Sequence, residues 1–350
     1  MPPLNLAKYF VVGISSSALF DLRAEDEIFR TQGLKAYSEY QIAHEQSVLM
    51  PGTGFPLVQA ILSLNGVDAT KKRVIVLVMS KNNADTSLRV SNSIRHHEID
   101  VGRGAYTSGA CLAPYLKAFS VDLFLSASQE DVQDATNAGF AAGLIYPYQC
   151  VPGEMEEGLR IAFDGDAVLF SGDSEKVYQE KGLTAFLQHE EDHAHEPLAD
   201  GPFAKLFRTL AALQRQGDQG EKALIRTALV TARNSPADER VIRTLRAWRV
   251  RVDEVFFMGG AEKAPVLEAF RPHIFFDDQD VHCLPASGVV LTARVFSPAQ
   301  PAKQTTFSFE IAQTSSATSE TVVAPNEKKS VGGIPAIIIP IREDTQLKSS

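Results

Sequence analysis

Cysteine is scarce in this chain, and tryptophan occurs only once. The 350 residues include three cysteines, Cys111, Cys150 and Cys283, which are odd in number and far apart. Domains that are stabilised by disulfide bonds are rich in cysteine and occur in oxidising compartments. The cysteine count therefore argues against a disulfide framework, and we expect a protein of the reducing cytoplasm.

Positive charge and long apolar runs are also in short supply. The chain has 43 acidic against 34 basic residues, a formal net charge of −9. This balance argues against broad binding of a nucleic-acid polymer, although a local basic pocket could hold one phosphate. The apolar stretch from Tyr9 to Phe20 is interrupted by three serines, and no segment supplies the ~20 apolar residues of a membrane helix. We expect a small anionic partner, with no membrane or nucleic acid involved.

Two aspartates at the end of an apolar run are the most informative feature that is present. Asp164 and Asp166 stand one residue apart, directly after the segment Leu159 to Phe163, which has the pattern of a buried strand. A carboxylate can attack phosphorus only if its own charge is screened, and Mg²⁺ held by carboxylates and substrate phosphate supplies that screening. The pattern predicts a divalent-metal and phosphoryl-transfer site.

Three further segments place polar side chains at the ends of predicted strands. The apolar segments 226–230, 254–258 and 274–276 are each followed by such residues: Thr231 and Arg233 after the first, Lys263 after the second, and Asp277 and Asp278 at the third. Open parallel sheets bind ligands at the carboxyl ends of their strands. The four segments are therefore expected to converge on one crevice.

Together these segments resemble the four motifs of the haloacid dehalogenase (HAD) phosphatase superfamily. Over roughly residues 8 to 297 the chain is similar, more narrowly, to the cytosolic 5′-nucleotidase type I family. The stretches that carry this similarity are DGDAVLFS at 164–171, LVTAR at 229–233, PHIFFDDQ at 272–279, and the shorter Phe20-Asp21-Leu22, His44-Glu45 and Pro51-Gly52.

The resemblance implies Mg²⁺-dependent hydrolysis of nucleoside 5′-monophosphates by a homo-oligomer. Asp164 would be the nucleophile that forms an aspartyl-phosphate, and Asp166 would be the acid and base. The residues expected to bind phosphate are Thr231, Arg233 and Lys263, and those expected at the metal are Asp164, Asp166, Asp277 and Asp278. The choice between Asp277 and Asp278 as the direct ligand stays open.

The two halves of the chain repeat one another at a nearly constant spacing. An offset of 149 pairs Gly33-Leu34 with Gly182-Leu183, and an offset of 151 pairs Arg89-Val90 with Arg240-Val241 and residues 109–119 with 260–270. We expect two copies of one α/β unit. The same alignment places Ser15, Ser17, Ser80, Leu112, Ser126 and Ala127 where the second copy has Asp164, Asp166, Thr231, Lys263, Asp277 and Asp278. The first copy is therefore predicted to be catalytically silent.

The predicted fold is α/β, with two Rossmann-like HAD-type units of parallel strands flanked by helices. Strands are expected at 9–14, 73–79, 123–125, 159–163, 226–230, 254–258, 274–276 and 288–295, and a helix at 240–248. The expected domains are a silent unit at 1–150, a catalytic unit at 151–298 and a mostly disordered tail at 299–350. Residues 171–216 exceed what a crossover needs, so we expect a small helical cap there. Phe186 and His193 in this cap are candidate substrate contacts, although Phe186 also fits a core aromatic.

Other readings of the sequence remain open. His189 to His193 has the spacing of an HExxH zinc motif, but its surroundings are acidic and its repeat partner, residues 40–44, keeps one histidine. We favour a solvated cap helix there. A phosphatase or phosphotransferase for another small phosphate ester is the nearest alternative enzyme. A nucleotide-sensing binding protein is the alternative from another class.

Overall fold

The computed structural model describes residues 4–66, 72–147, 158–217 and 224–299. Residues up to 300 form one compact unit. Apart from Ala299, the predicted tail lies outside the described residues, as does Cys150. No helix in the described ranges is both long enough and apolar enough to cross a bilayer.

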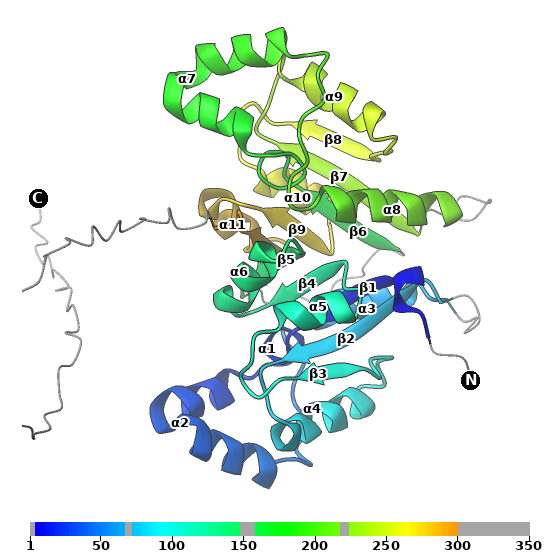
Figure 1. The fold of residues 1–350 in the computed structure, drawn as a ribbon, viewed down its shortest axis with the longest axis vertical. Helices are drawn as coiled ribbons and strands as arrows, with labels where there is room; N and C mark the ends of the chain where they lie inside the picture. Colours follow the sequence, from blue (N-terminus) through cyan, green and yellow to red (C-terminus); the bar gives the residue numbers. More distant parts are fainter. Residues whose placement is uncertain (1–3, 67–71, 148–157, 218–223, 300–350) are drawn as a thin grey trace, which may run out of the picture. The chain divides into compact units, whose positions relative to one another are not determined.

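The strands of this unit form one ten-stranded sheet (Figure 1). Their bounds are β1 Phe10–Ile14, β2 Val74–Ser80, β3 Gly104–Tyr106, β4 Leu123–Ser126, β5 Ala141–Ile145, β6 Leu159–Phe163, β7 Ile225–Thr231, β8 Glu254–Phe257, β9 Ile274–Asp277 and β10 Thr292–Val295. Strands β1, β2, β6 and β9 are buried along their whole length. This burial explains why they are continuous apolar runs without alternation.

The helices alternate with the strands along the chain, as the sequence predicts for an α/β fold. Their bounds are η1 Leu6–Lys8, α1 Ser16–Leu19, α2 Arg23–Ala43, α3 Phe55–Ser63, α4 Ala84–His96, α5 Ala113–Ala118, α6 Gln129–Asn137, α7 Asp173–Asp192, α8 Ala204–Gly217, α9 Asp238–Ala247, α10 Ala264–Phe270 and α11 Asp280–Ala286. The helix expected at 240–248 corresponds to α9.

The sheet order is β3-β2-β1-β4-β5-β10-β9-β6-β7-β8. Read from each edge inward, the two halves place their strands in the same sequence. Strands β5 and β10 meet at the centre, where Ala293 pairs with Ile145. That pairing is antiparallel, whereas the other strand pairs are parallel. The predicted parallel pairing is found within each half, but the two units, expected as separate sheets, are joined into one mixed sheet.

The predicted strands are found with small shifts of their ends, but two strands were missed. These are the short edge strand β3 and strand β5, whose sequence AAGLI carries little β-branched or aromatic character. The strand expected at 288–295 is shorter in the structure, where β10 spans Thr292–Val295. Strands with such weak local propensity are stabilised by pairing with their neighbours in the sheet.

Helices α2 and α7 each contain a sharp kink at a glycine. Gly33 has φ 82° and ψ −179°, and Gly182 has φ 79° and ψ 178°. This backbone region is accessible almost only to glycine. Both helices follow the first strand of their half, and α7 lies within the predicted cap segment.

Helix α8, at the other end of the predicted cap segment, packs on the sheet. Phe207 of α8 is buried, and its ring centre lies 5.2 Å from that of Phe163 in β6. Leu206 and Leu210 on the same helix are also buried. Helix α8 is therefore a crossover helix of the core, and the predicted cap is narrowed to α7.

Candidate active site

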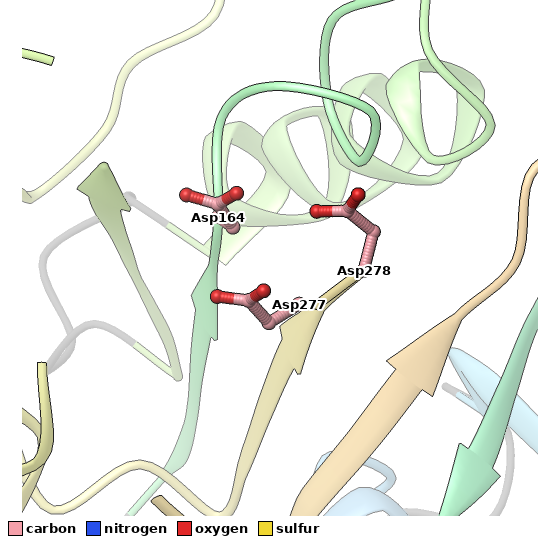
Figure 2. A group of neighbouring side chains, drawn as sticks. All are labelled: Asp164, Asp277 and Asp278. Atoms are coloured by element: carbon pink, nitrogen blue, oxygen red, sulfur yellow. The ribbon is translucent and has the colours of Figure 1, made fainter. Parts of the chain in front are cut away.

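Two neighbouring strands bring three carboxylates together. Asp164 follows β6, and Asp277 and Asp278 lie at the end of β9, which pairs with β6 in parallel. Figure 2 shows the three side chains gathered at these strand ends. One oxygen from each lies within 4.8 Å of the others, and no other group of three His, Cys, Asp or Glu residues in the described ranges could hold a metal. The geometry brings Asp164, Asp277 and Asp278 together as predicted.

Lys263 lies between two of these carboxylates. Its Nζ donates to Oδ1 of Asp164 at 2.7 Å and to Oδ2 of Asp277 at 2.6 Å, and the residue is only 3% exposed. Burial alone would lower the pKa of this ammonium, but the charges of Asp164 and Asp277 outweigh it and raise the pKa. Lys263 therefore stays charged and holds a fixed positive charge beside Asp164.

The donor set fits a hard divalent cation. Oδ1 of Asp278 is buried and accepts no hydrogen bond from the described residues. Burial, followed by the negative charges of Asp164 and Asp277, raises the pKa of Asp278 to about 8. Burial likewise raises the pKa of Asp164 despite the opposing charge of Lys263. Carboxylates crowded in this way are what a Mg²⁺-type ion neutralises.

The side chain of Asp166 is turned toward an arginine. Arg233 donates from Nε and Nη2 to the two oxygens of Asp166, each at 2.7 Å, in the bidentate geometry typical of strong ion pairs. Its third nitrogen, Nη1, pairs with Glu190. Arg233 was predicted to contact phosphate, but in this arrangement all of its donor nitrogens face carboxylates. Asp166, predicted at the metal, is likewise outside the carboxylate group.

Sequence reasoning missed Glu190, which has no side-chain exposure. Besides Arg233, it accepts from Arg240 Nη1 at 2.9 Å and from Ser174 Oγ at 2.7 Å. Burial would raise its pKa, but Arg233, Ser174 and Arg240 together lower it. In the amino-terminal half, Arg89, which pairs with Arg240 in the repeat, also holds a buried acid, Glu25, at 2.6 Å.

Thr231 and Gly165 lie against one another at the end of β7. Thr231 is 1% exposed, and its Oγ1 accepts from the backbone N–H of Arg233 at 3.3 Å. A Cβ atom placed on Gly165 would lie 3.1 Å from that Oγ1. Gly165 therefore keeps room for the hydroxyl and for any group that approaches it.

The two predicted substrate contacts have structural partners. Phe186 is 9% exposed and lies under the Arg233 guanidinium, 5.4 Å from ring centre to carbon. His193 donates through Nδ1 to the carbonyl of His189, at 2.7 Å, and its ring centre lies 4.2 Å from that of His189, with the two planes tilted by 37°.

The amino-terminal half repeats this histidine geometry. His44 contacts the Tyr40 carbonyl at 2.8 Å, and its ring lies 4.0 Å from that of Tyr40. A contact that recurs where the catalytic residues are missing points to a structural role for His193. The glutamate of the HExxH pattern, Glu190, is buried between arginines, which also argues against a zinc site.

The fold and these contacts define an α/β protein with a buried, carboxylate-rich site at the carboxyl ends of parallel strands. The chain belongs to the 5′-nucleotidase family, whose model matches residues 2–302. It is 36% identical over 280 residues to human cytosolic 5′-nucleotidase 1B. That alignment includes 77% of this chain but 46% of the relative, so the chain spans less than half of the relative's length. Comparison with solved structures gave no significant match.

Proposed function

We propose that this protein hydrolyses nucleoside 5′-monophosphates to nucleoside and phosphate in the cytoplasm, with Mg²⁺ as cofactor. The observation that carries the proposal is the group of Asp164, Asp277 and Asp278 beside buried Lys263. The predicted assembly into a homo-oligomer stays part of this proposal.

Asp164 is the proposed nucleophile. One of its oxygens attacks phosphorus, the bond from phosphorus to the 5′-oxygen breaks, and an aspartyl-phosphate forms. Water then attacks that phosphorus and releases phosphate, which restores the carboxylate. Mg²⁺ held by Asp164, Asp277 and Asp278 would neutralise phosphate charge when it is bound. Lys263 and the Thr231 hydroxyl are placed to stabilise charge on the phosphoryl oxygens.

Asp166 is the proposed acid and base, and Arg233 positions it. Asp166 gives a proton to the leaving 5′-oxygen and takes one from the attacking water. Both of its oxygens accept hydrogen bonds from Arg233, and Nη1 of Arg233 pairs with Glu190. We therefore assign Arg233 to the orientation of Asp166, in place of the direct phosphate contact expected from the sequence.

We also propose that α7 is the cap that selects the nucleoside. Tyr178 and Leu183 on this helix are 46% and 58% exposed, so both are accessible to a ligand. The ring of Tyr178 meets that of buried Phe186 edge-on at 6.2 Å, and Phe186 in turn contacts Arg233. This chain of contacts links an exposed aromatic to the candidate site, and it favours Tyr178 over Phe186 for stacking on a base.

The two halves are proposed to derive from one duplicated unit. Three features support this: the matching order of strands from each sheet edge, the kinks at Gly33 and Gly182, and the paired arginines Arg89 and Arg240. Arg89 Nε donates to the Ser47 carbonyl and Arg240 Nε to the Glu196 carbonyl, both at 2.9 Å. A common origin explains why one half retains the fold without the catalytic carboxylates.

Phosphate release from a panel of substrates tests the proposed reaction. The panel contains nucleoside 5′-monophosphates, nucleoside 3′-monophosphates and sugar phosphates, each with Mg²⁺ and with EDTA. Selective turnover of the 5′-nucleotides that EDTA abolishes is the expected result. Turnover of sugar phosphates alone would identify a different phosphatase, and tight nucleotide binding without turnover would indicate a sensor.

A further inference from the structure

A cavity of about 620 Å³ lies in the amino-terminal half, at the position that the catalytic residues occupy in the other half. Its floor includes Ser15, Ser17, Ser80 and Asn82, which follow or end strands β1 and β2. In the repeat these residues correspond to Asp164, Asp166, Thr231 and Arg233. The volume falls in the range of pockets that hold small molecules.

The charges of this cavity are unsuited to phosphate or a metal ion. Lys263 is replaced by Leu112, and the carboxylates of the metal group are replaced by Ser15, Ser126 and Ala127. Lys81 supplies the one ammonium of the lining, and it is paired with Asp131 at 2.8 Å and Glu130 at 3.2 Å. Asp26 adds a third carboxylate. A phosphate group would meet more negative than positive charge, which disfavours its binding.

The floor of the cavity offers neutral hydrogen-bonding groups. Nδ2 of Asn82 is buried and has no hydrogen-bond partner among the described residues, while its Oδ1 accepts from the Tyr37 hydroxyl at 3.1 Å. Ser15 and Ser17 lie close by, with their hydroxyl oxygens 3.3 Å apart. A buried donor without a partner is costly, and a ligand oxygen or ring nitrogen would satisfy it.

One wall of the cavity is apolar and belongs to the kinked helix α2. Phe29 and Leu34 line it, although they are 52% and 64% exposed. The ring of Phe29 meets that of Tyr37 edge-on at 5.8 Å, with an interplanar angle of 81°. A flat aromatic ligand group could pack on this wall while hydroxyl groups of the ligand face the serines and Asn82.

We propose that this cavity is a second, non-catalytic binding site for an uncharged nucleoside. The apolar wall suits the base, the neutral polar floor suits the ribose, and the unfavourable charge excludes the phosphorylated form. The choice of a nucleoside over another neutral polyol with an aromatic ring rests on the proposed function, of which a nucleoside is the product. The site would let the enzyme respond to its product without blocking the catalytic carboxylates.

Equilibrium dialysis of the full chain with adenosine and with inosine tests the proposal. Nucleosides carry no phosphate, so the measurement needs no turnover and can use the wild-type protein. The key variants are Asn82→Leu, which removes the buried donor at similar volume, and Leu34→Glu, which adds a charge to the apolar wall. Each is expected to weaken nucleoside binding at this site by about tenfold, the effect of one lost hydrogen bond or a comparable mismatch.

Ile42→Glu is the matched control, because Ile42 is an exposed apolar residue on the same helix as Leu34 and does not line the cavity. This control variant should retain the component of nucleoside binding that Leu34→Glu weakens. Since Leu34 is well exposed, Leu34→Glu keeps the test valid if Asn82→Leu fails to fold. Inorganic phosphate, and AMP in the presence of EDTA, should not displace nucleoside from this component.

The proposal is overturned if neither nucleoside binds, if binding is the same in the wild type and both pocket variants, or if phosphate or AMP displaces the nucleoside as well as unlabelled nucleoside does. Its failure is separable from failure of the proposed function. Turnover of 5′-nucleotides without Leu34-dependent binding would defeat only the second site. Leu34-dependent nucleoside binding without any turnover would defeat only the proposed reaction.

Discussion

Arg233 connects Asp166 with Glu190. Its guanidinium binds both oxygens of Asp166 on one side and Glu190 on the other, and its side chain is 2% exposed. A proton transferred by Asp166 must therefore pass through a carboxylate whose position is fixed by this arginine. Such fixed placement is what efficient acid–base catalysis requires.

Asp166→Asn should keep the fold and lose the proton transfer. We expect kcat for a nucleoside 5′-monophosphate to fall by ~10²–10⁴-fold, the usual contribution of a positioned acid or base, with a much smaller change in KM. Steady-state phosphate release measures both. Asp173→Asn, at an exposed position on α7, is the matched control. A kcat of Asp166→Asn near that of the control would remove Asp166 from the mechanism.

The carboxylate group makes stability depend on pH and on metal. Without a cation, the pKa of Asp278 is raised to about 8, so the folded state keeps a proton that the unfolded chain has lost by about pH 4. The folded state then binds more protons between these values, and its stability falls as pH rises through this window. The proposed Mg²⁺ would bind the ionised group, so its stabilising effect should grow over the same window.

Thermal unfolding at pH 5.5 and pH 8, with EDTA or with Mg²⁺, measures this coupling. We expect a larger Mg²⁺-induced rise in Tm at pH 8, and a clearly smaller rise in Asp278→Asn at the same pH. Asp192→Asn, on the exposed end of α7, serves as the control. A Mg²⁺ effect that is larger at pH 5.5, or that Asp278→Asn leaves intact, would contradict the metal assignment.

At the residue scale, the sequence was informative wherever a side chain directly follows a strand. Asp164, Thr231, Asp277 and Asp278 could be placed together because strand ends are recognisable and share an edge of the sheet. The partner of Arg233 could not be predicted, since it depends on how α7 bends back over β7. Glu190 was hidden for the same reason, within a helix that looked acidic and solvated.

Helix α7 is attached to the sheet through a buried ionic cluster. Glu190 links it to Arg233 after β7 and to Arg240 of α9, and Ser174 ties the start of the helix to the same carboxylate. The mean polarity of α7 suggests a loosely held surface helix. Its only strongly buried acidic residue instead joins two arginines that are themselves buried.

Glu190→Gln should destabilise the protein by roughly 3–5 kcal/mol, because it leaves buried Arg240 without its counter-charge and Arg233 with Asp166 alone. The depressed pKa of Glu190 gives a stabilising contribution that is present above the unfolded pKa and is lost as pH falls through the folded pKa. The difference between variant and wild type should therefore shrink in acid. Urea unfolding at neutral and acidic pH measures it.

Glu191→Gln is the control for this element, because Glu191 is exposed beside Glu190 on the same helix. It should change stability by less than ~0.5 kcal/mol. Equal losses in the two variants would mean that the cluster does not hold α7. Weaker activity in Glu190→Gln at a temperature where it is folded would show that the cluster also positions Asp166 through Arg233.

At the scale of the whole unit, the two halves share one sheet and one main core. The largest apolar cluster includes Ile14 and Ile145 from the first half, and Ile161, Phe276 and Ala293 from the second. The sequence predicted the α/β alternation, because that depends on local patterns, whereas the duplication stays a proposal. It could not predict the antiparallel join of β5 and β10, which depends on how two complete halves meet.

Unfolding of this unit should be a single cooperative transition. Trp248 is the only tryptophan and belongs to the second half, so its fluorescence reports that half, whereas far-UV circular dichroism reports both. We expect coincident urea transitions by the two probes, as a shared sheet and core require. A fluorescence transition clearly separated from the dichroism transition would show that the halves fold independently.

The central claim is that Asp164 is the nucleophile of a 5′-nucleotidase site, and kinetics of Asp164→Asn test it most directly. With saturating Mg²⁺ and a nucleoside 5′-monophosphate that the wild type hydrolyses, we expect kcat to fall by at least ~10³-fold, because the amide cannot form the aspartyl-phosphate. The variant should retain a cooperative unfolding transition. A folded variant with kcat within about tenfold of the wild type would contradict the account, and His189 and His193 would then need to be tested.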